Sequence, residues 1–218
     1  KREVDATPVV ENGTVFVGSK DHSFYAIDAA SGRKKWSFQT GGAIYDRAII
    51  CNDMVLFTSA DGFLYAVDLT TGEKKWAFET LAGMRSGEKR LPMAPIVADG
   101  VLYLTTSPTH MVNTPTKSFL YAIDVASGLA KWMFAADEDD PSQPISTNGL
   151  IFFSTRIDYY MKDFLNNPSK KEHDSRPPMA TLYAIEAPSG KMKWQFQSRT
   201  DYQHYPASVV RDMVIWGT

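Results

Sequence analysis

The sequence has little cysteine, no close pair of histidines, little net charge and no long apolar run. Each of these features argues against a class of structure, site or partner. One cysteine, Cys51, stands among 218 residues, so no disulfide forms within the chain. We expect Cys51 to be a small, buried apolar residue. The four histidines, His22, His110, His173 and His204, lie far apart. The sequence therefore offers no close pair of histidine or cysteine ligands for zinc.

The net charge and the hydropathy of the sequence argue against two further classes of partner, nucleic acids and membranes. The formal net charge is −2 at pH 7, which gives no reason to expect nucleic acid or an anionic membrane surface. No apolar run approaches the ~20 residues that span a bilayer. The N-terminal segment "KREVDATPVV" lacks the apolar stretch of a signal peptide, which leaves open a leader removed earlier. At 44% hydrophobic and 22% charged residues, the composition is ordinary for a globular protein.

The sequence is rich in internal repetition. The stretch "AIDAASGRKKW" (26–36) returns as "AVDLTTGEKKW" (66–76), "AIDVASGLAKW" (122–132) and "AIEAPSGKMKW" (184–194). Each copy, which we call a frame, keeps Ala, an acid, a hydroxyl residue, Gly and Trp in the same order. An apolar pair, a turn and an alternating apolar run precede each frame, and this upstream pattern begins once more in "YPASVVRDMVIWGT" (205–218). A repeat of ~40 residues is typical of propellers and other repeat folds.

Each unit contains four short strand candidates, which in the first unit are 7–11, 14–19, 24–28 and 34–40. The first two are joined by Asn-Gly, the strongest local signal for a hairpin, because both residues tolerate positive φ. Asp28 is placed to accept hydrogen bonds from the turn that follows, and Gly32 to adopt the left-handed conformation that a longer hairpin loop requires. The frame is therefore predicted to be a hairpin.

One four-stranded meander cannot bury both of its faces, whereas several arranged radially can, as in a β-propeller. The frame alanine is small enough to admit a large side chain of a neighbouring blade, and the tryptophan is large enough to reach it. We predict an all-β propeller of four-stranded antiparallel blades in one domain, 1–218, with complete blades at 7–40, 47–80, 94–136 and 143–198, half a blade at 205–218, and insertions at about 107–118 and 156–180. The residues expected to dock blade against blade are Ala26, Gly32, Trp36, Ala66, Gly72, Trp76, Ala122, Gly128, Trp132, Ala184, Gly190 and Trp194.

The frame Ala-x-Asp-x-x-Thr-Gly-x-x-x-Trp resembles the tryptophan-docking motif of the pyrroloquinoline quinone (PQQ) repeat propellers. That family includes the quinoprotein alcohol dehydrogenases and the BamB-like outer-membrane assembly lipoproteins. Glu186 stands in place of Asp, and Ser replaces Thr at Ser31, Ser127 and Ser189, so the acceptor and hydroxyl chemistry is kept. The resemblance implies the fold, a larger ring of seven or eight blades, and a periplasmic or extracellular location. It also implies that further chain, or a second copy, completes the ring.

The extra length of the longer units falls between their second and third strands and in the segment between units two and three. In an up-and-down meander, the loop between strands two and three emerges at the same end as the segment that joins one blade to the next. We call this the long-loop end, and the opposite one the short-turn end. Loops on a rigid scaffold commonly carry binding. The candidate ligand-binding residues at the long-loop end are Asp46, Arg47, Arg90, Asp140, Tyr202 and His204.

Three segments of the long-loop end keep alternative interpretations. The acidic run 137–140 is either a solvated turn, which its spacing favours, or a calcium ligand cluster. The apolar stretch "YYMKDFL" (159–165) is either a helical turn capping the ring or a partner contact. The polar, Pro-rich segment 166–178 is either a flexible flap, which its composition favours, or a recognition motif.

The resemblance implies two alternative functions. Quinoprotein dehydrogenases of this fold use an aspartate base, a calcium ion and, in many cases, a disulfide of adjacent cysteines against the quinone. One cysteine excludes that disulfide, and no catalytic or metal-binding residue can be assigned by motif, so no cofactor is assigned. The sequence favours a non-catalytic binding or scaffolding propeller that holds a protein partner or small ligand at the long-loop end. The alternative is a fragment of a PQQ-dependent alcohol or sugar dehydrogenase, with PQQ and calcium.

Overall fold

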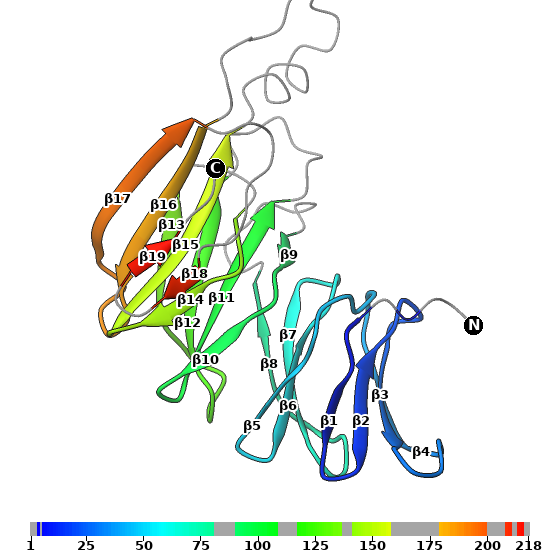
Figure 1. Cartoon of the computed structure of the whole chain (residues 1–218). Helices are drawn as coiled ribbons and strands as arrows, with labels where there is room; N and C mark the ends of the chain where they lie inside the picture. The colour runs from blue at the N-terminus through cyan, green and yellow to red at the C-terminus, as the bar shows by residue number, and fades with distance from the viewer. Residues whose placement is uncertain are drawn as a thin grey trace, which may run out of the picture.

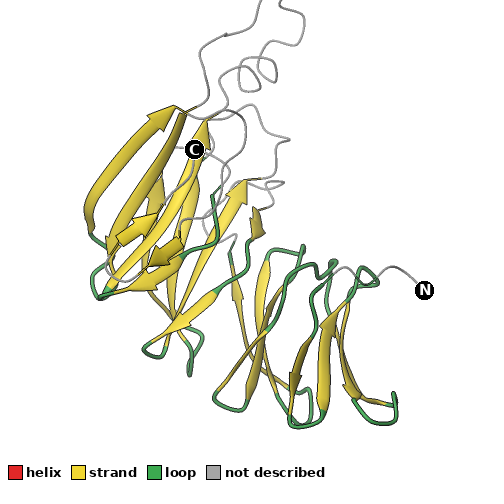
Figure 2. Cartoon of the chain, viewed as in Figure 1, coloured by secondary structure: helices red, strands yellow, loops and turns green. Residues whose placement is uncertain are grey.

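The computed structural model describes residues 4, 6–80, 90–108, 117–136, 141–157, 179–199, 208–210 and 213–215. This part of the chain consists of strands and turns (Figure 2). It contains no helix, and therefore none long and apolar enough to cross a membrane. The strands form separate antiparallel sheets, in each of which the spatial order of the main strands follows the order along the chain.

Four sheets have the architecture of propeller blades (Figure 1). Sheet one contains β1 (Val9–Glu11), β2 (Thr14–Gly18), β3 (Ser23–Asp28) and β4 (Lys34–Gln39). Sheet two contains β5 (Ile49–Cys51), β6 (Met54–Thr58), β7 (Phe63–Asp68) and β8 (Lys74–Glu79). Sheet three contains β10 (Ile96–Ala98), β11 (Val101–Pro108), β12 (Ser118–Asp124) and β13 (Ala130–Ala136), with β9 (Arg90–Pro92) added beside β11. Sheet four contains β14 (Ile145–Thr147), β15 (Leu150–Ile157), β16 (Met179–Glu186) and β17 (Met192–Arg199).

A further pair, β18 (Ser208–Val210) and β19 (Met213–Ile215), begins a fifth unit. The innermost strands β10, β14 and β18 contact each other in succession, as expected of sheets arranged around a common axis. The predicted all-β propeller with four-stranded blades is confirmed. The strands of the first unit end within two residues of their predicted limits. The added strand β9 was not predicted.

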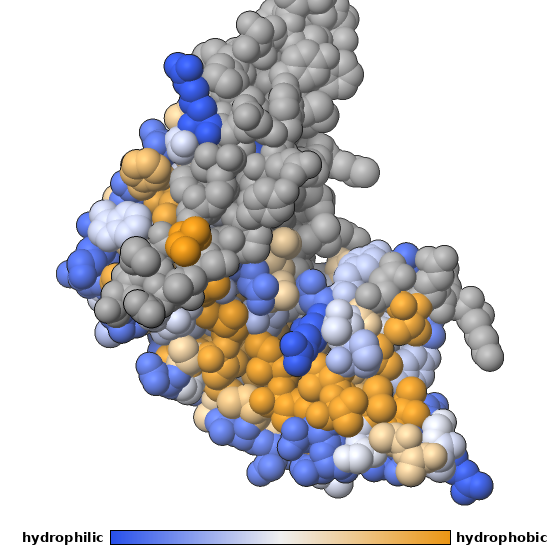
Figure 3. Space-filling view, in the orientation of Figure 1, coloured by the Kyte–Doolittle hydropathy of each residue, from blue (hydrophilic) through white to orange (hydrophobic). Residues whose placement is uncertain are grey.

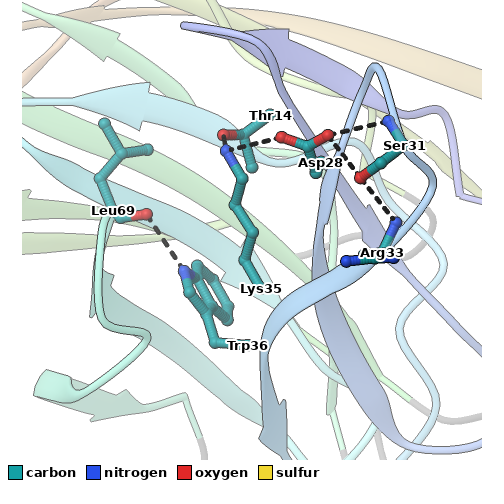
Figure 4. A network of polar contacts seen from close by, with 7 residues as sticks. All are labelled: Thr14, Asp28, Ser31, Arg33, Lys35, Trp36 and Leu69. Atoms are coloured by element: carbon teal, nitrogen blue, oxygen red, sulfur yellow. Dashed lines mark hydrogen bonds and ion pairs between the residues drawn. The ribbon is translucent and has the colours of Figure 1, made fainter.

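The turns have the conformations that their residues suggest. Asn12 and Gly13, between β1 and β2, have φ of 46° and 69°, and Gly32 has φ of 70°. Asp28 Oδ1 accepts hydrogen bonds from the Ser31 amide at 2.8 Å and the Ser31 hydroxyl at 2.7 Å (Figure 4). Lys35 adds an ion pair to the other carboxylate oxygen, with Nζ and Oδ2 3.5 Å apart. The predicted hairpin of the frame, held by its acid and its glycine, is confirmed.

The frame tryptophans of the first three sheets reach across to the next sheet. The indole of Trp36 lies against Gly72 so closely that a Cβ on this glycine would be 2.6 Å from Trp36 Cε3. Trp36 Nε1 donates a hydrogen bond to the carbonyl of Leu69 at 3.2 Å (Figure 4). We call the frame glycine, together with the carbonyl three residues before it, the indole seat. The same contacts join Trp76 to Gly128 and Val125, and Trp132 to Gly190 and Ala187.

The frame alanine lies in the apolar cluster between its own sheet and the next, as Ala26 does with Phe57 and Val67. Ala26 and Trp36 are cross-strand partners in β3 and β4. Directly opposed residues project from the same face of a sheet, so the alanine makes room for the tryptophan of its own sheet. The residue that receives the neighbour's indole is the frame glycine. At Gly72 a side chain is excluded both by φ of 74° and by the indole itself.

Apolar clusters fill the spaces between successive sheets. Between sheets one and two, Phe24 and Phe57 are fully buried and stack with ring centroids 4.2 Å apart. A second cluster joins sheets two and three around Leu56 and Leu104, and a third joins sheets three and four around Leu120 and Phe153. Burial of large aromatic and aliphatic side chains is the main source of stability here. The sheets therefore form one scaffold that fixes the positions of the loops.

Candidate functional site

The long-loop end is confirmed as a single end of the molecule. Every sheet is an antiparallel meander, so the connection between its second and third strands leaves from the end where its first strand begins. The ends of β11 and β15, from which the two insertions start, lie at this end (Figure 1). Arg90, the first residue of β9, pairs with Pro108, the last residue of β11, and is placed there too.

In sheets one and two, this end is closed by tight turns whose polar groups bond to one another. Asp21 accepts the Tyr25 hydroxyl at 2.8 Å and the Ser23 amide at 3.1 Å. Asp61 accepts the Tyr65 hydroxyl at 2.9 Å, and its Oδ2 also accepts the amide of Gly41, from the segment that follows sheet one, at 2.7 Å. Burial, together with the Asp61 carboxylate, raises the pKa of Tyr65 above its ordinary value, so the phenol remains a donor.

In sheets three and four, the same end is extended. Strands β11 and β15 have eight residues each, whereas β2 and β6 have five. The extension of β11 is paired on its inner side with β9, over residues 106–108. The extension of β15 pairs with β16 as far as Ile157 and Met179. The scaffold thus extends the hairpins β11–β12 and β15–β16 at the end from which the insertions leave.

A layer of buried hydroxyls underlies this end. Thr58, Thr105 and Ser154 occupy equivalent positions near the ends of β6, β11 and β15, and all are buried. Thr105 donates to the carbonyl of Ser142 at 2.9 Å, which joins sheet three to the segment before sheet four. Ser142 Oγ accepts the Ser154 amide at 3.0 Å. Sequence reasoning missed this layer, although "LFTS", "YLTTS" and "FFSTR" repeat the hydroxyl residue at the strand end.

Among the predicted site residues whose side chains the structure describes, Asp46 is the one in a specific polar contact. It lies in the segment that enters sheet two, and its Oδ2 accepts the Thr58 hydroxyl at 3.0 Å. Burial raises the pKa of the Asp46 carboxyl above its ordinary value, and the Thr58 hydrogen bond opposes this. The surroundings of Asp46 therefore disfavour the ionised form of its carboxyl group.

The other predicted site residues are only partly placed. Arg47 follows Asp46 and is exposed. The backbone of Arg90 begins β9. Asp140, Tyr202 and His204 lie outside the described residues, as do the acidic run 137–140 and the segments 159–165 and 166–178. Among the described members of the set, only Asp46 and Arg47 come together, as neighbours in the chain.

A calcium-bound quinone does not fit the described residues. Calcium takes six to eight oxygen ligands, several of them carboxylates. Within the described ranges, no group of three or more His, Cys, Asp or Glu side chains lies close enough to hold a metal ion. Asp46, which is half-buried at the long-loop end, is already engaged by Thr58. No step of a quinone-dependent reaction is therefore derived from these side chains.

Comparison with known proteins identifies the family. Residues 1–146 match the family model described as outer membrane protein assembly factor BamB. No curated protein matches the sequence.

Solved structures of similar fold include two alcohol dehydrogenases and a BamB protein. The quinohemoprotein alcohol dehydrogenase of Comamonas testosteroni matches with a TM-score of 0.68 at 19% identity, over 91% of this chain and 35% of the enzyme. Alcohol dehydrogenase ADHIIG of Pseudomonas putida HK5 gives 0.70 at 18% identity, over 91% and 34%. BamB of Moraxella catarrhalis gives 0.54 at 12% identity, over 99% and 68%. The chain thus spans about a third of the length of these dehydrogenases.

Proposed function

Because the chain belongs to the family of outer membrane protein assembly factor BamB, we propose that it is a non-catalytic, extracytoplasmic propeller that binds a protein partner at its long-loop end. The observation that carries the proposal is that sheets one and two differ from sheets three and four at this end. The turns of sheets one and two bond to themselves, whereas in sheets three and four β11 and β15 have eight residues each against five in β2 and β6 and so extend the scaffold at this end.

A rigid platform with projecting hairpins suits contact with a protein surface. Its backbone is fixed by ladder pairing up to Pro108 and Ile157, so the segments that follow start from set positions. Preorganisation of this kind lowers the entropy lost on binding. Asp46 and Arg47 would then contribute charges at the side of the platform nearest sheet two.

Site-specific photo-crosslinking tests this proposal. A photoreactive amino acid at Lys117, exposed beside the start of β12 at the long-loop end, is compared with one at Arg33, exposed in the short-turn end of sheet one. We expect protein crosslinks in the cell envelope from position 117 and few from position 33. Crosslinking of equal yield and identity from both positions would contradict binding at the long-loop end.

The second candidate is a fragment of a PQQ-dependent dehydrogenase, favoured by the higher TM-scores of 0.68 and 0.70 for the two alcohol dehydrogenases, against 0.54 for BamB. PQQ would supply the redox chemistry when bound. The test is addition of PQQ and calcium, followed by absorbance spectroscopy and dye-linked oxidation of alcohols and sugars. The binding proposal expects no turnover, and turnover would replace it with the enzyme.

A further inference from the structure

At the long-loop end, the space between sheets two and three contains polar side chains, among them Asp46, whose Oδ2 accepts the Thr58 hydroxyl at 3.0 Å. Thr58 lies two residues after Leu56 in β6, and alternate residues of a strand share a face. By the same rule, Thr106 in β11 shares its face with Leu104. Leu56 and Leu104 belong to one apolar cluster between these two sheets. Thr58 and Thr106 therefore both project into this space, beyond its apolar cluster.

The hydroxyl of Thr106 is buried and unpaired. Thr106 has no exposed surface, and its Oγ1 has no hydrogen-bond partner. Buried hydroxyls are nearly always paired, because burial removes their hydrogen bonds to water. Ser59 is the equivalent residue of sheet two, and its hydroxyl donates to the carbonyl of Gly42 at 3.2 Å. Thr106 thus keeps an unused donor and acceptor at a position where its counterpart is satisfied.

The Asp46 carboxylate has no cation beside it. Each acid of the first three frames, Asp28, Asp68 and Asp124, pairs with a lysine whose Nζ lies 3.0 to 3.6 Å from Oδ2. Asp46 forms no ion pair with any described side chain, and burial raises its pKa. It is only half-buried, so a ligand can reach it. The missing partner is therefore a positive charge from outside the described residues.

The two neighbouring spaces are closed at this end. Between sheets one and two, a Cβ on Gly18 would overlap the side chain of Ile44, which is fully buried. Between sheets three and four, the Thr105 hydroxyl donates to the Ser142 carbonyl at 2.9 Å. Figure 3 shows apolar residues across the surface of β1 and β5 and hydrophilic residues beyond them, towards the long-loop end. Of the three spaces, the one between sheets two and three combines an unpaired hydroxyl with an uncompensated carboxylate.

We propose that Asp46, Thr58 and Thr106 bind a primary ammonium group, which is a lysine side chain of the protein partner if the function proposed above holds. An ammonium group has three donors and no acceptor. Three groups accept them: the Asp46 carboxylate, the Thr106 hydroxyl, and the lone pairs of the Thr58 hydroxyl, whose proton is directed to Asp46. A guanidinium has five donors in a rigid plane, and calcium takes several carboxylates, so neither matches this set as well.

Titration of the intact chain with n-butylammonium, followed by NMR, tests the site without a partner. We expect saturable shifts of the Asp46 carboxyl carbon and of the Thr58 and Thr106 methyl groups. The control probe is n-butyltrimethylammonium, which has the same charge and chain but no N–H donor, and we expect it to bind about tenfold more weakly or less. Equal binding of the two probes, or no shift at these residues, would overturn the proposal.

Matched variants separate binding from folding. Asp46→Asn is expected to abolish binding of n-butylammonium, although the free chain should gain stability because the buried charge is removed. Asp68→Asn removes the same charge at the opposite end of sheet two and should leave binding unchanged. Thr106→Val is expected to weaken binding about tenfold, whereas Thr105→Val, on the other face of β11, should not. An equal loss in a variant and its control would contradict a site made of these side chains.

Photo-crosslinking identifies the source of the ammonium group. Asp46→Asn is introduced into the chain that carries the photoreactive amino acid at Lys117, and we expect crosslinks to the partner to fall about tenfold. If n-butylammonium binds while these crosslinks keep their full yield, the group belongs to a small amine and the partner lysine is ruled out. If the chain without Asp46→Asn gives no crosslinks from this position, the proposed function fails, and the titration still decides whether the ammonium site exists.

Discussion

The outer hairpins of sheets one and two share one frame and one backbone conformation but differ in what covers them. Gly32 and Gly72 have φ of 70° and 74°, and Asp28 and Asp68 each accept hydrogen bonds from the turn that follows them. Gly72 is buried under Trp36, whereas Gly32 is exposed. The turn of the frame thus has the same conformation whether or not an indole of another sheet covers it. Packing against that sheet adds to the stability of the fold. Sheets two and three each place an indole on the following sheet and receive one from the preceding sheet.

The largest expected effect on stability is the difference between a tryptophan that packs on the next sheet and one that is partly exposed. Trp76 lies on Gly128 and donates to the Val125 carbonyl at 3.0 Å, whereas Trp194 is 39% exposed. We expect Trp76→Ala to lower the free energy of unfolding by about 3 kcal/mol or more, because it leaves a cavity between two sheets. Trp194→Ala is expected to cost about 1 kcal/mol. Urea unfolding followed by circular dichroism measures both, and equal losses would show that the two indoles do not differ in packing.

The next largest effect on stability is expected from substitution of the frame glycines. Gly72→Ala combines the strain of a positive φ with a clash against Trp36, so we expect a loss of about 2–4 kcal/mol. Gly32→Ala has the strain alone and is expected to cost about 1 kcal/mol. Gly13→Ala, with φ of 69°, is the control for strain. If Gly32→Ala destabilised the chain as much as Gly72→Ala, something would already cover the first seat.

The smallest effect compares two carboxylates at opposite ends of sheet two. The amide of Thr71, the Lys75 ammonium and the amide of Thr70 lower the pKa of Asp68 to about 2. A folded pKa below the unfolded ~3.9 stabilises the protein above pH ~4, and this stabilisation is lost as the pH falls through the folded pKa. For Asp46 the sign is opposite, because burial raises its pKa and stability falls as it ionises.

Asp68→Asn is therefore expected to lower the free energy of unfolding at pH 7, and Asp46→Asn to raise it. The amide oxygen of the asparagine introduced at position 46 can still accept the Thr58 hydrogen bond, so the second substitution removes the charge alone. Both differences should shrink as the pH is lowered from 7 towards 2. Unfolding measured at several pH values checks the signs, and a destabilising Asp46→Asn would show that the ionised carboxylate is favourably held.

Sequence reasoning reached the fold because its signals are local. Asn12-Gly13, the frame acid and the frame glycine each determine a turn within a few residues, so their prediction needs no neighbour. The seat was harder to predict, because which small residue receives an indole depends on how two sheets are placed against each other. The role of Gly72 follows from that placement, whereas the pairing of β9 with β11 joins two segments of one sheet that no turn signal connects.

The candidate site was predicted less completely for a related reason. The direction of an antiparallel meander determines which end carries the insertions, and this prediction is confirmed by the positions of β11 and β15. The individual residues depend on loop conformation, which no repeat determines. Asp46 has a described position because it lies next to a strand, whereas Asp140, Tyr202 and His204 lie in segments outside the described residues. Their roles stay predictions.

The most direct measurement is hydrogen exchange at the four frame indoles, followed by NMR of the Nε1–H groups. Those of Trp36, Trp76 and Trp132 donate to carbonyls of the next sheet at 3.2, 3.0 and 2.9 Å. If these tryptophans join one sheet to the next, their three Nε1–H groups exchange slowly and that of Trp194 exchanges fast. Similar, rapid exchange at all four would contradict the radial arrangement of the sheets.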